Sequence, residues 1–178
     1  MDTNGFDTHF ELPISDARNE YRQTEMKSGD KKPLWTCPEC GVRLVTRNMW
    51  HSCGIYTLDA LFAKSESNVR RTFDKLAQTV KAADGDVTII PQKTRAVFQL
   101  RTRFISVYPR KAFLSVGFVF ISKVPNDRFV KIEGPITGAY VHYANLSDPK
   151  DVDATIKTWI DAALPYGRQD RALGGRRS

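Results

Sequence analysis

All three cysteines of this 178-residue chain fall within one seventeen-residue stretch, together with a histidine. Cys37 and Cys40 are three positions apart, and Gly41 follows them; ten residues separate Cys40 from His51, and Cys53 lies two positions after His51. Two thiolates at this spacing can bind one metal ion only where the chain turns sharply between them. Cysteine and histidine are the ligand types that suit tetrahedral zinc. The spacing therefore predicts a zinc knuckle with four protein ligands: Cys37, Cys40, His51 and Cys53.

Two simpler interpretations of these residues stay open. In one, His51 is a surface histidine beside a three-thiol site completed by water; in the other, Cys53 is a buried free thiol. A site closed by four protein ligands leaves no position for a substrate, so the predicted zinc is structural rather than catalytic. A module of about twenty residues buries too little apolar surface to fold unaided, so residues 33–55 are expected to depend on the metal.

The chain after the cysteines shows helical and then strand patterns, which together predict an α+β domain. A short helix at 58–63 and a longer one at 68–83 are indicated, the second by an apolar stripe at helical spacing. Strands are predicted at 87–90, 94–101, 104–109, 113–122 and 140–146. We therefore expect an antiparallel sheet of about five strands with helices packed on one face, preceded by the small zinc knuckle.

The last helix has the clearest boundary signals. Asp148 is the expected N-cap, Pro149 is the first helical position, and Pro165 and Gly167 mark the expected end. At the two ends of the chain, neither the first 32 residues nor the last eleven show a sustained apolar period. The predicted organisation is a flexible arm (1–32), the knuckle (33–55), the α+β domain (56–167) and a basic flexible tail (168–178).

Positive charge is concentrated in the predicted sheet. The formal net charge is +7, whereas residues 1–32 hold seven acids against five bases. Residues 93–111 contain six bases and no acid, and burial of the intervening apolar residues is expected to expose Arg95, Arg101 and Arg103 together with Gln99. A solvated basic face would also explain such a stretch. The candidate nucleic-acid or anion-binding residues are Lys93, Arg95, Arg101, Arg103, Arg110 and Lys111.

The sequence does not point to an enzyme. Phosphate-binding glycine loops, a metalloprotease His-Glu-x-x-His and a nucleophile elbow are absent from it. A metal-nuclease pattern would need an acid at position 91, where the chain has proline. His142 is predicted to point outward from its strand with Tyr140, without an identifiable partner for acid–base chemistry.

Several short strings resemble an uncharacterised bacterial domain family. They are Trp35-Thr-Cys-Pro-Glu-Cys-Gly, Trp50-His-Ser-Cys-Gly, Lys93-Thr-Arg-Ala-Val-Phe and Tyr108-Pro-Arg-Lys. The resemblance covers roughly residues 35–167 and implies an α+β domain with a short zinc knuckle in front. That family is a domain of unknown function, so the resemblance implies no activity.

Three functions are compatible with these patterns. The first is a nucleic-acid-binding module, because the basic strand lies beside Phe104, Tyr108 and Phe113, on which a base could stack. The second is a domain that binds a small anionic ligand or an acidic partner protein, and the third is an enzyme with an unrecognised site. A cytoplasmic protein with reduced thiols and no membrane partner is expected, because the sequence has neither an export signal nor a long apolar run. No pattern indicates an oligomeric state.

Overall fold

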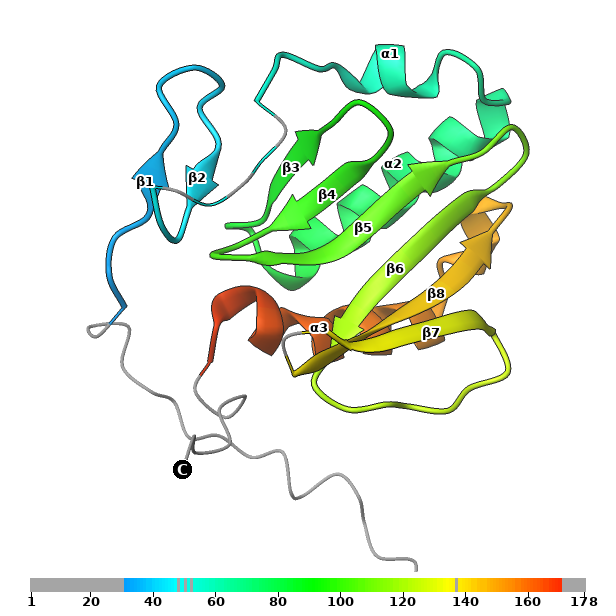
Figure 1. The fold of residues 1–178 in the computed structure, drawn as a ribbon. Coiled ribbons are helices and arrows are strands. Elements are labelled where there is room, and N and C mark those ends of the chain that lie inside the picture. The colour runs from blue at the N-terminus through cyan, green and yellow to red at the C-terminus, as the bar shows by residue number, and fades with distance from the viewer. Residues whose placement is uncertain (1–30, 48, 50, 52, 137, 171–178) are drawn as a thin grey trace, which may run out of the picture. The chain divides into compact units, whose positions relative to one another are not determined.

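A computed structural model of the protein describes residues 31–47, 49, 51, 53–136 and 138–170. The predicted arm lies outside these residues apart from Lys31 and Lys32, and so does the predicted tail apart from 168–170. A two-stranded hairpin, β1 (Trp35–Thr36) and β2 (Arg43–Leu44), precedes an α+β domain (Figure 1). The expected α+β class is therefore confirmed.

Six antiparallel strands form the sheet of the α+β domain (Figure 1). In spatial order they are β3 (Thr88–Pro91), β4 (Ala96–Gln99), β5 (Arg103–Pro109), β6 (Leu114–Phe120), β8 (Ala139–Leu146) and β7 (Phe129–Ile136). The strand beyond the expected five is β7. It lies at the edge of the sheet, where proline is tolerated, and its register against β8 shifts twice. This strand could not be recognised in the sequence, because it contains Gly134-Pro135 and its residues do not alternate between buried and exposed.

The helices pack on one face of the sheet, as the sequence predicts. α1 (Leu58–Phe62) leads into α2 (Ser67–Ala83), and α2 and α3 (Ala154–Arg168) cover the same sheet face (Figure 1). The predicted stripe of α2 is completely or almost completely buried and consists of Val69, Phe73, Leu76 and Val80. Burial of each such side chain stabilises the fold by about 1.5–3 kcal/mol. Packing therefore contributes more to the stability of this helix than its intrinsic helix propensity does.

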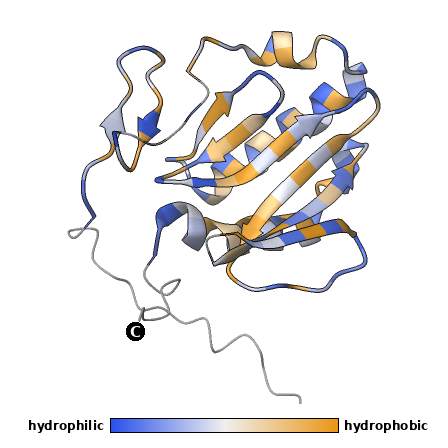
Figure 2. Ribbon diagram, in the orientation of Figure 1, coloured by the Kyte–Doolittle hydropathy of each residue, from blue (hydrophilic) through white to orange (hydrophobic). Residues whose placement is uncertain are grey.

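The two faces of the sheet differ in chemistry, and Figure 2 shows the alternating hydropathy along its strands. The predicted inward-facing residues of β6 are all buried under the helices: Leu114, Val116, Phe118 and Phe120. Their neighbours in the strand point to the opposite side, which we call the open face because no described helix covers it. The open face carries Ser106 and Tyr108 from β5, Ser115 and Gly117 from β6, and Tyr143 from β8.

The start of the last helix differs from the prediction. Asp148 caps a separate 3-10 turn, Pro149–Asp151, rather than the α-helix. The N-cap of α3 is Asp153, whose side chain accepts a hydrogen bond of 3.1 Å from the Ile156 N–H. Asp148 and Asp153 therefore cap two successive elements, which the sequence pattern predicts as a single helix.

The end of the same helix lies beyond the predicted stop, because α3 continues three residues past Pro165. A tertiary contact explains the extension. A side chain at Gly167 would lie 2.7 Å from the Phe104 ring, so the glycine lets helix and ring meet directly. The Gly167 carbonyl also accepts the N–H groups of Arg101 (2.9 Å) and Thr102 (3.0 Å). These contacts with the β4–β5 turn hold the last turn of the helix in place.

The prediction that His142 points outward is wrong. Its side chain is completely buried, and its ring centroid lies 4.6 Å from that of Phe120 and 4.9 Å from that of Phe129. His142 is the cross-strand partner of Phe118, so it shares the helix-covered face of the sheet. Its Nε2 accepts a hydrogen bond of 2.9 Å from the Val124 N–H, which ties the β6–β7 loop to the sheet.

Burial lowers the pKa of His142, so we expect a pH-dependent loss of stability. The unfolded chain takes up a proton near the ordinary histidine pKa of about 6.5, and the folded chain resists it. The stability that the neutral His142 side chain contributes is fully present above that pH. It declines as the pH falls toward the lowered pKa, by at most about 1.4 kcal/mol per pH unit. Urea unfolding at about pH 7.5 and about pH 5.5 measures it. His142→Gln should lose less stability between the two than the wild type; an equal loss would contradict the assignment.

Polar contacts join the two ends of the described chain. Lys31 Nζ forms an ion pair with Asp170 (2.8 Å) and donates to the Arg168 carbonyl (2.8 Å). The guanidinium group of Arg101 donates to the Lys32 carbonyl at 2.7 Å. The segment that enters the knuckle and the segment that leaves α3 therefore lie side by side.

Candidate metal centre and basic sheet face

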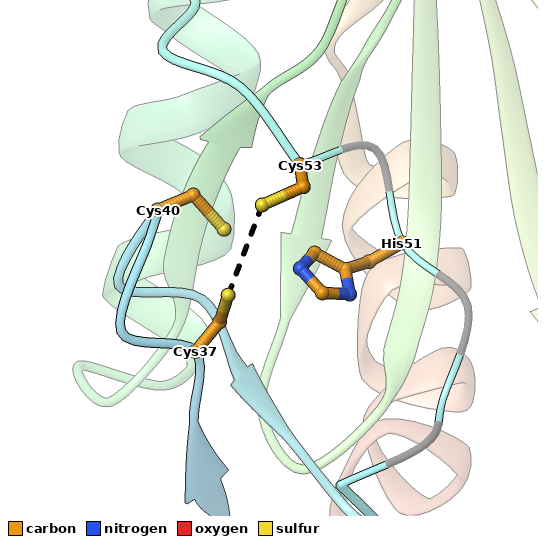
Figure 3. Close-up of side chains that lie close together, drawn as sticks. All are labelled: Cys37, Cys40, His51 and Cys53. Carbon is orange, nitrogen blue, oxygen red and sulfur yellow. Dashed lines mark hydrogen bonds between the residues drawn. The ribbon is translucent and has the colours of Figure 1, made fainter.

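Four side chains point toward one another in the knuckle (Figure 3). Cys37 and Cys40 belong to the β1–β2 hairpin, and His51 and Cys53 belong to the segment after β2. Their ligand atoms all lie within 4.8 Å of one another. The predicted grouping is confirmed, and neither His51 nor Cys53 stands apart from it. The cluster could hold a metal ion.

The spacing of the sulfur atoms fits ligands of a single ion. The Sγ atoms of Cys37 and Cys53 are 3.8 Å apart. Two thiolates bound to one tetrahedral zinc at about 2.3 Å would place their sulfurs about 3.8 Å apart. A disulfide needs about 2.05 Å, and all three cysteines are free thiols.

The ring of His51 is oriented as a metal ligand. Its Nδ1 lies 3.2 Å from the Met49 carbonyl oxygen, which can accept a hydrogen bond from Nδ1–H. Nε2 is then unprotonated; it is buried and has no hydrogen-bond partner among the described residues. A buried acceptor without a partner is costly, and a metal ion would satisfy it. A backbone carbonyl on the other ring nitrogen is also the usual support for a metal-binding histidine.

A tight turn positions the first two thiols. Gly41 has a φ of +71°, which glycine adopts without strain. Its N–H donates to the Cys37 carbonyl (2.9 Å), and the Cys37 N–H donates to the Val42 carbonyl (2.9 Å). The chain is thereby folded back on itself, and Cys40 lies next to Cys37.

The thiols of the cluster differ in acidity. Burial opposes ionisation of Cys37, but hydrogen bonds from the backbone N–H groups of Cys40 and Glu39 outweigh it and lower the pKa to about 6. Burial and the neighbouring thiols raise the pKa of Cys53 to about 11. A cation at the centre would favour the thiolate form of all three.

A buried side chain docks the knuckle on the sheet. Gln99 of β4 donates through Nε2 to the Arg43 carbonyl in β2, and the Arg43 guanidinium donates to Thr88 of β3 at 3.4 Å. Between the two elements lies a cleft of about 240 Å³, lined by residues of the 40–43 and 88–91 segments. The sequence places Gln99 on an exposed basic face; this is wrong, because the knuckle contacts the sheet there.

The structure places the predicted basic residues in several different turns and in one strand. Lys93 is exposed in the β3–β4 turn, and Arg110 and Lys111 are exposed in the β5–β6 turn. Arg101 lies in the β4–β5 turn instead of a strand, because β4 is shorter than predicted. Its side chain bonds Lys32 and donates to Gln169 at 3.2 Å. Arg95, directly before β4, also lies outside the strands, so five of the six bases are in turns.

Arg95, at the end of the β3–β4 turn, and Arg103, in β5, lie on the open face. Arg95 donates to Gln92 and to the Tyr108 hydroxyl, both at 2.7 Å, and its guanidinium carbon lies 5.7 Å from the Tyr108 ring centroid. Arg103 is half-buried and pairs across the strands with Gln99. Burial, together with the positive charge of Arg95, lowers the pKa of Arg103. Neither arginine has a carboxylate partner in the part of the chain that the structure describes.

The open face also carries Tyr143, which the sequence analysis missed. Its hydroxyl donates to Glu133 of β7 (3.1 Å), and Glu133 forms an ion pair with Lys131. Burial and the neighbouring Tyr108 raise the pKa of Tyr143 to about 12, so the hydroxyl stays protonated at neutral pH. Adjacent strand residues point to opposite faces, so placing His142 outward assigned Tyr143 to the wrong side.

Only part of the predicted aromatic group faces outward. Tyr108 is half-buried on the open face, and Phe113 is half-buried just before β6. Phe104 is completely buried, so its predicted stacking role is wrong. Gln99 pairs with Arg103 and the preceding β4 residue pairs with Ile105, which leaves Phe104 as the extra residue of a β-bulge. The bulge turns its ring toward α3.

Taken together, these features define a small α+β domain preceded by a module whose three cysteines and one histidine could hold a metal ion. The chain belongs to the family described as a domain of unknown function, DUF5655, whose model matches residues 58–164. The match covers the α+β domain and leaves the knuckle outside it. No curated protein and no solved structure matches the chain. None of the described helices combines the length and the apolar character needed to span a bilayer.

Proposed function

We propose that the chain is a zinc-stabilised domain that binds nucleic acid on the open face of its sheet. The observation that carries the proposal is the pair Arg95 and Arg103, two cations on one face without a carboxylate partner among the described residues. Two like charges repel each other, and partial burial removes water from one of them. An anion on this face would offset both costs.

Phosphate groups suit these two side chains. Guanidinium groups bind phosphate through planar, paired hydrogen bonds and remain charged at any physiological pH. The Tyr108 hydroxyl and Gln92 hold Arg95 in place, so little side-chain freedom would be lost on binding. A strand of nucleic acid offers a row of phosphates, which can reach both arginines.

Zinc is the ion we propose for the knuckle. Three thiolates and an imidazole form a soft, closed set of four ligands, typical of structural zinc. In the described part of the knuckle, Cys37 and Leu44 are the buried residues, so its own core is very small. Metal binding would supply the stability that this core lacks. The ordered knuckle would then hold its place beside the basic face through Gln99.

A small anionic ligand or an acidic partner protein is the main alternative. The described cleft lies between the knuckle and β3, and its only charged lining residue is Arg43. Arg95 and Arg103 instead belong to an extended sheet surface, which suits a long polyanion better than a small molecule. For an enzyme, a candidate carboxylate is Glu133, which is bonded to Tyr143 of the open face, but its bonds to Lys131 and Tyr143 argue against an acid–base role.

The proposal predicts a salt-dependent affinity that needs these two arginines. The wild type should bind a labelled oligonucleotide of about 20 nucleotides with a Kd of about 10⁻⁴ to 10⁻⁶ M. Each lost phosphate contact lowers the slope of log affinity against log salt by about 0.7 for a single strand. For the double variant Arg95→Ala/Arg103→Ala, the magnitude of this slope should therefore be smaller by about 1.4 than for the wild type. Fluorescence anisotropy across a salt series measures the slope.

The matched control removes two charges elsewhere. Lys75 and Lys81 are exposed on α2, on the other side of the sheet, so Lys75→Ala/Lys81→Ala should keep the slope. Equal losses in both double variants would show that net charge, not this face, drives binding. If the wild type does not bind at about 50 mM salt, the nucleic-acid proposal fails. Displacement of the oligonucleotide by sub-millimolar inorganic pyrophosphate would favour the small-anion alternative.

A further inference from the structure

The Tyr143 ring lies over a position of the open face that has no side chain. Gly117 of β6 is its cross-strand partner. A Cβ atom at Gly117 would lie 3.0 Å from Cε1 and 3.3 Å from Cδ1 of the Tyr143 ring. Real Cβ atoms rarely have contacts this short, so another residue at position 117 would shift the ring or the Val141 side chain, which would lie equally close. The glycine thus lets the Tyr143 ring rest against the bare backbone of the neighbouring strand.

The ring is also fixed at its far end. The Tyr143 hydroxyl donates to Glu133 at 3.1 Å, and Lys131 neutralises the charge of Glu133. The side chain is half-buried, and no other aromatic ring of the described residues packs on it. An aromatic ring held in one position loses little entropy when a flat group stacks on its exposed side.

The residues around Tyr143 indicate which kind of flat group could stack on its ring. Tyr108 and Arg95 lie close enough to Tyr143 to affect its ionisation. Aromatic rings interleaved with guanidinium groups on a sheet face that no described helix covers are suited to bases and phosphates of the same nucleic-acid strand. A base inside a duplex has both faces covered by its neighbours, so only an unpaired base can stack on the ring.

We infer that the ligand of the open face is single-stranded nucleic acid, with one unpaired base stacked on Tyr143 over Gly117. The inference rests on the proposed function and adds to it the strand form and the base-contacting residue. Arg95 and Arg103 then contact the backbone, and Tyr143 contacts a base. Stacking needs no particular base, so binding is tolerant of sequence.

The test compares three labelled probes with the full-length chain: single-stranded dT12, the matching duplex, and an abasic 12-mer with the same phosphates. Tyr143→Ala should weaken dT12 binding about tenfold, which is within the range expected for the loss of stacking on one aromatic ring. It should leave abasic-oligomer binding and the salt slope for dT12 unchanged. Tyr143→Phe keeps the ring and loses only the hydroxyl, so it should bind dT12 within about twofold of the wild type. Tyr143→Leu replaces Tyr143→Ala if the smaller side chain does not give a folded protein, as judged by circular dichroism.

The outcomes separate this inference from the proposed function. If the wild type binds duplex and abasic probes as tightly as dT12, and loss of the ring changes nothing, stacking is overturned. The dependence on Arg95 and Arg103 would still stand in that case. If Tyr143→Phe loses as much affinity as Tyr143→Ala, the hydroxyl and not the ring face carries the effect, and the inference fails. If no probe binds the wild type, the proposed function fails and this inference fails with it.

Discussion

Replacing Cys40 by serine is expected to reduce bound zinc from about one equivalent per chain to less than half an equivalent. A serine hydroxyl is a far weaker zinc ligand than a thiolate, and zinc binding to such modules contributes about 10–16 kcal/mol of apparent free energy. Residues 33–55 should therefore lose their fixed structure. Elemental analysis gives the zinc content, and amide NMR spectra follow the knuckle and the α+β domain separately.

The α+β domain should survive this change, because its apolar core does not include the knuckle residues Cys37 and Leu44. Glu39→Gln is the matched control: it removes a charge between the two hairpin cysteines without removing a ligand, so the zinc content should stay the same. A Cys40→Ser chain that retains a full equivalent would rule out the four-ligand site. So would a wild-type chain, grown with zinc, that contains less than half an equivalent.

Replacing Gly167 by valine should destabilise the α+β domain by about 3 kcal/mol, toward the upper end for overpacking. The first added carbon would already lie 2.7 Å from the completely buried Phe104 ring. Relief would require moving the end of α3, whose Gly167 carbonyl holds the Arg101 and Thr102 N–H groups. Thermal unfolding should show a melting temperature lower by roughly 10 °C.

Gly85 provides the same substitution without the clash. A Cβ atom there would meet nothing within 4 Å. We therefore expect Gly85→Val to change the free energy of unfolding by less than about 1 kcal/mol. If the two valine variants melt at the same temperature, the contact between α3 and the β4–β5 bulge does not hold the helix end.

The elements that could be predicted from the sequence are those whose burial follows a simple period. The stripe of α2 and the alternating residues of β6 are examples, because each has one face that only the core can accept. The elements that could not be predicted depend on tertiary contacts. α3 passes Pro165 because Gly167 packs on Phe104, and β7 becomes a strand because β8 offers it an edge. Phe104 is far from Gly167 in the sequence, and β7, although it directly precedes β8, shows no alternation that would mark it as a strand.

The metal cluster and the basic face also differ in how far they could be predicted from the sequence. The ligand spacing of the knuckle is local, so Cys37, Cys40, His51 and Cys53 could be assigned from the sequence. The basic face depends on where β4 ends and on which face β8 turns inward. β4 ends at Gln99, which removes Arg101 from the face, and burial of His142 adds Tyr143 to it. Alternation fixes two faces of a strand but does not say which one is buried when both carry apolar residues.

The ion pair between Lys31 and Asp170 has a consequence for how this domain can be combined with others. The polypeptide enters and leaves the folded unit at the same place. A unit of this kind can be spliced into a surface loop of a host protein without stretching the host backbone, because its two attachment points are already adjacent. For the same reason, a circularly permuted chain that joins residue 170 to residue 31 through a short glycine-rich linker is expected to keep the sheet and both long helices.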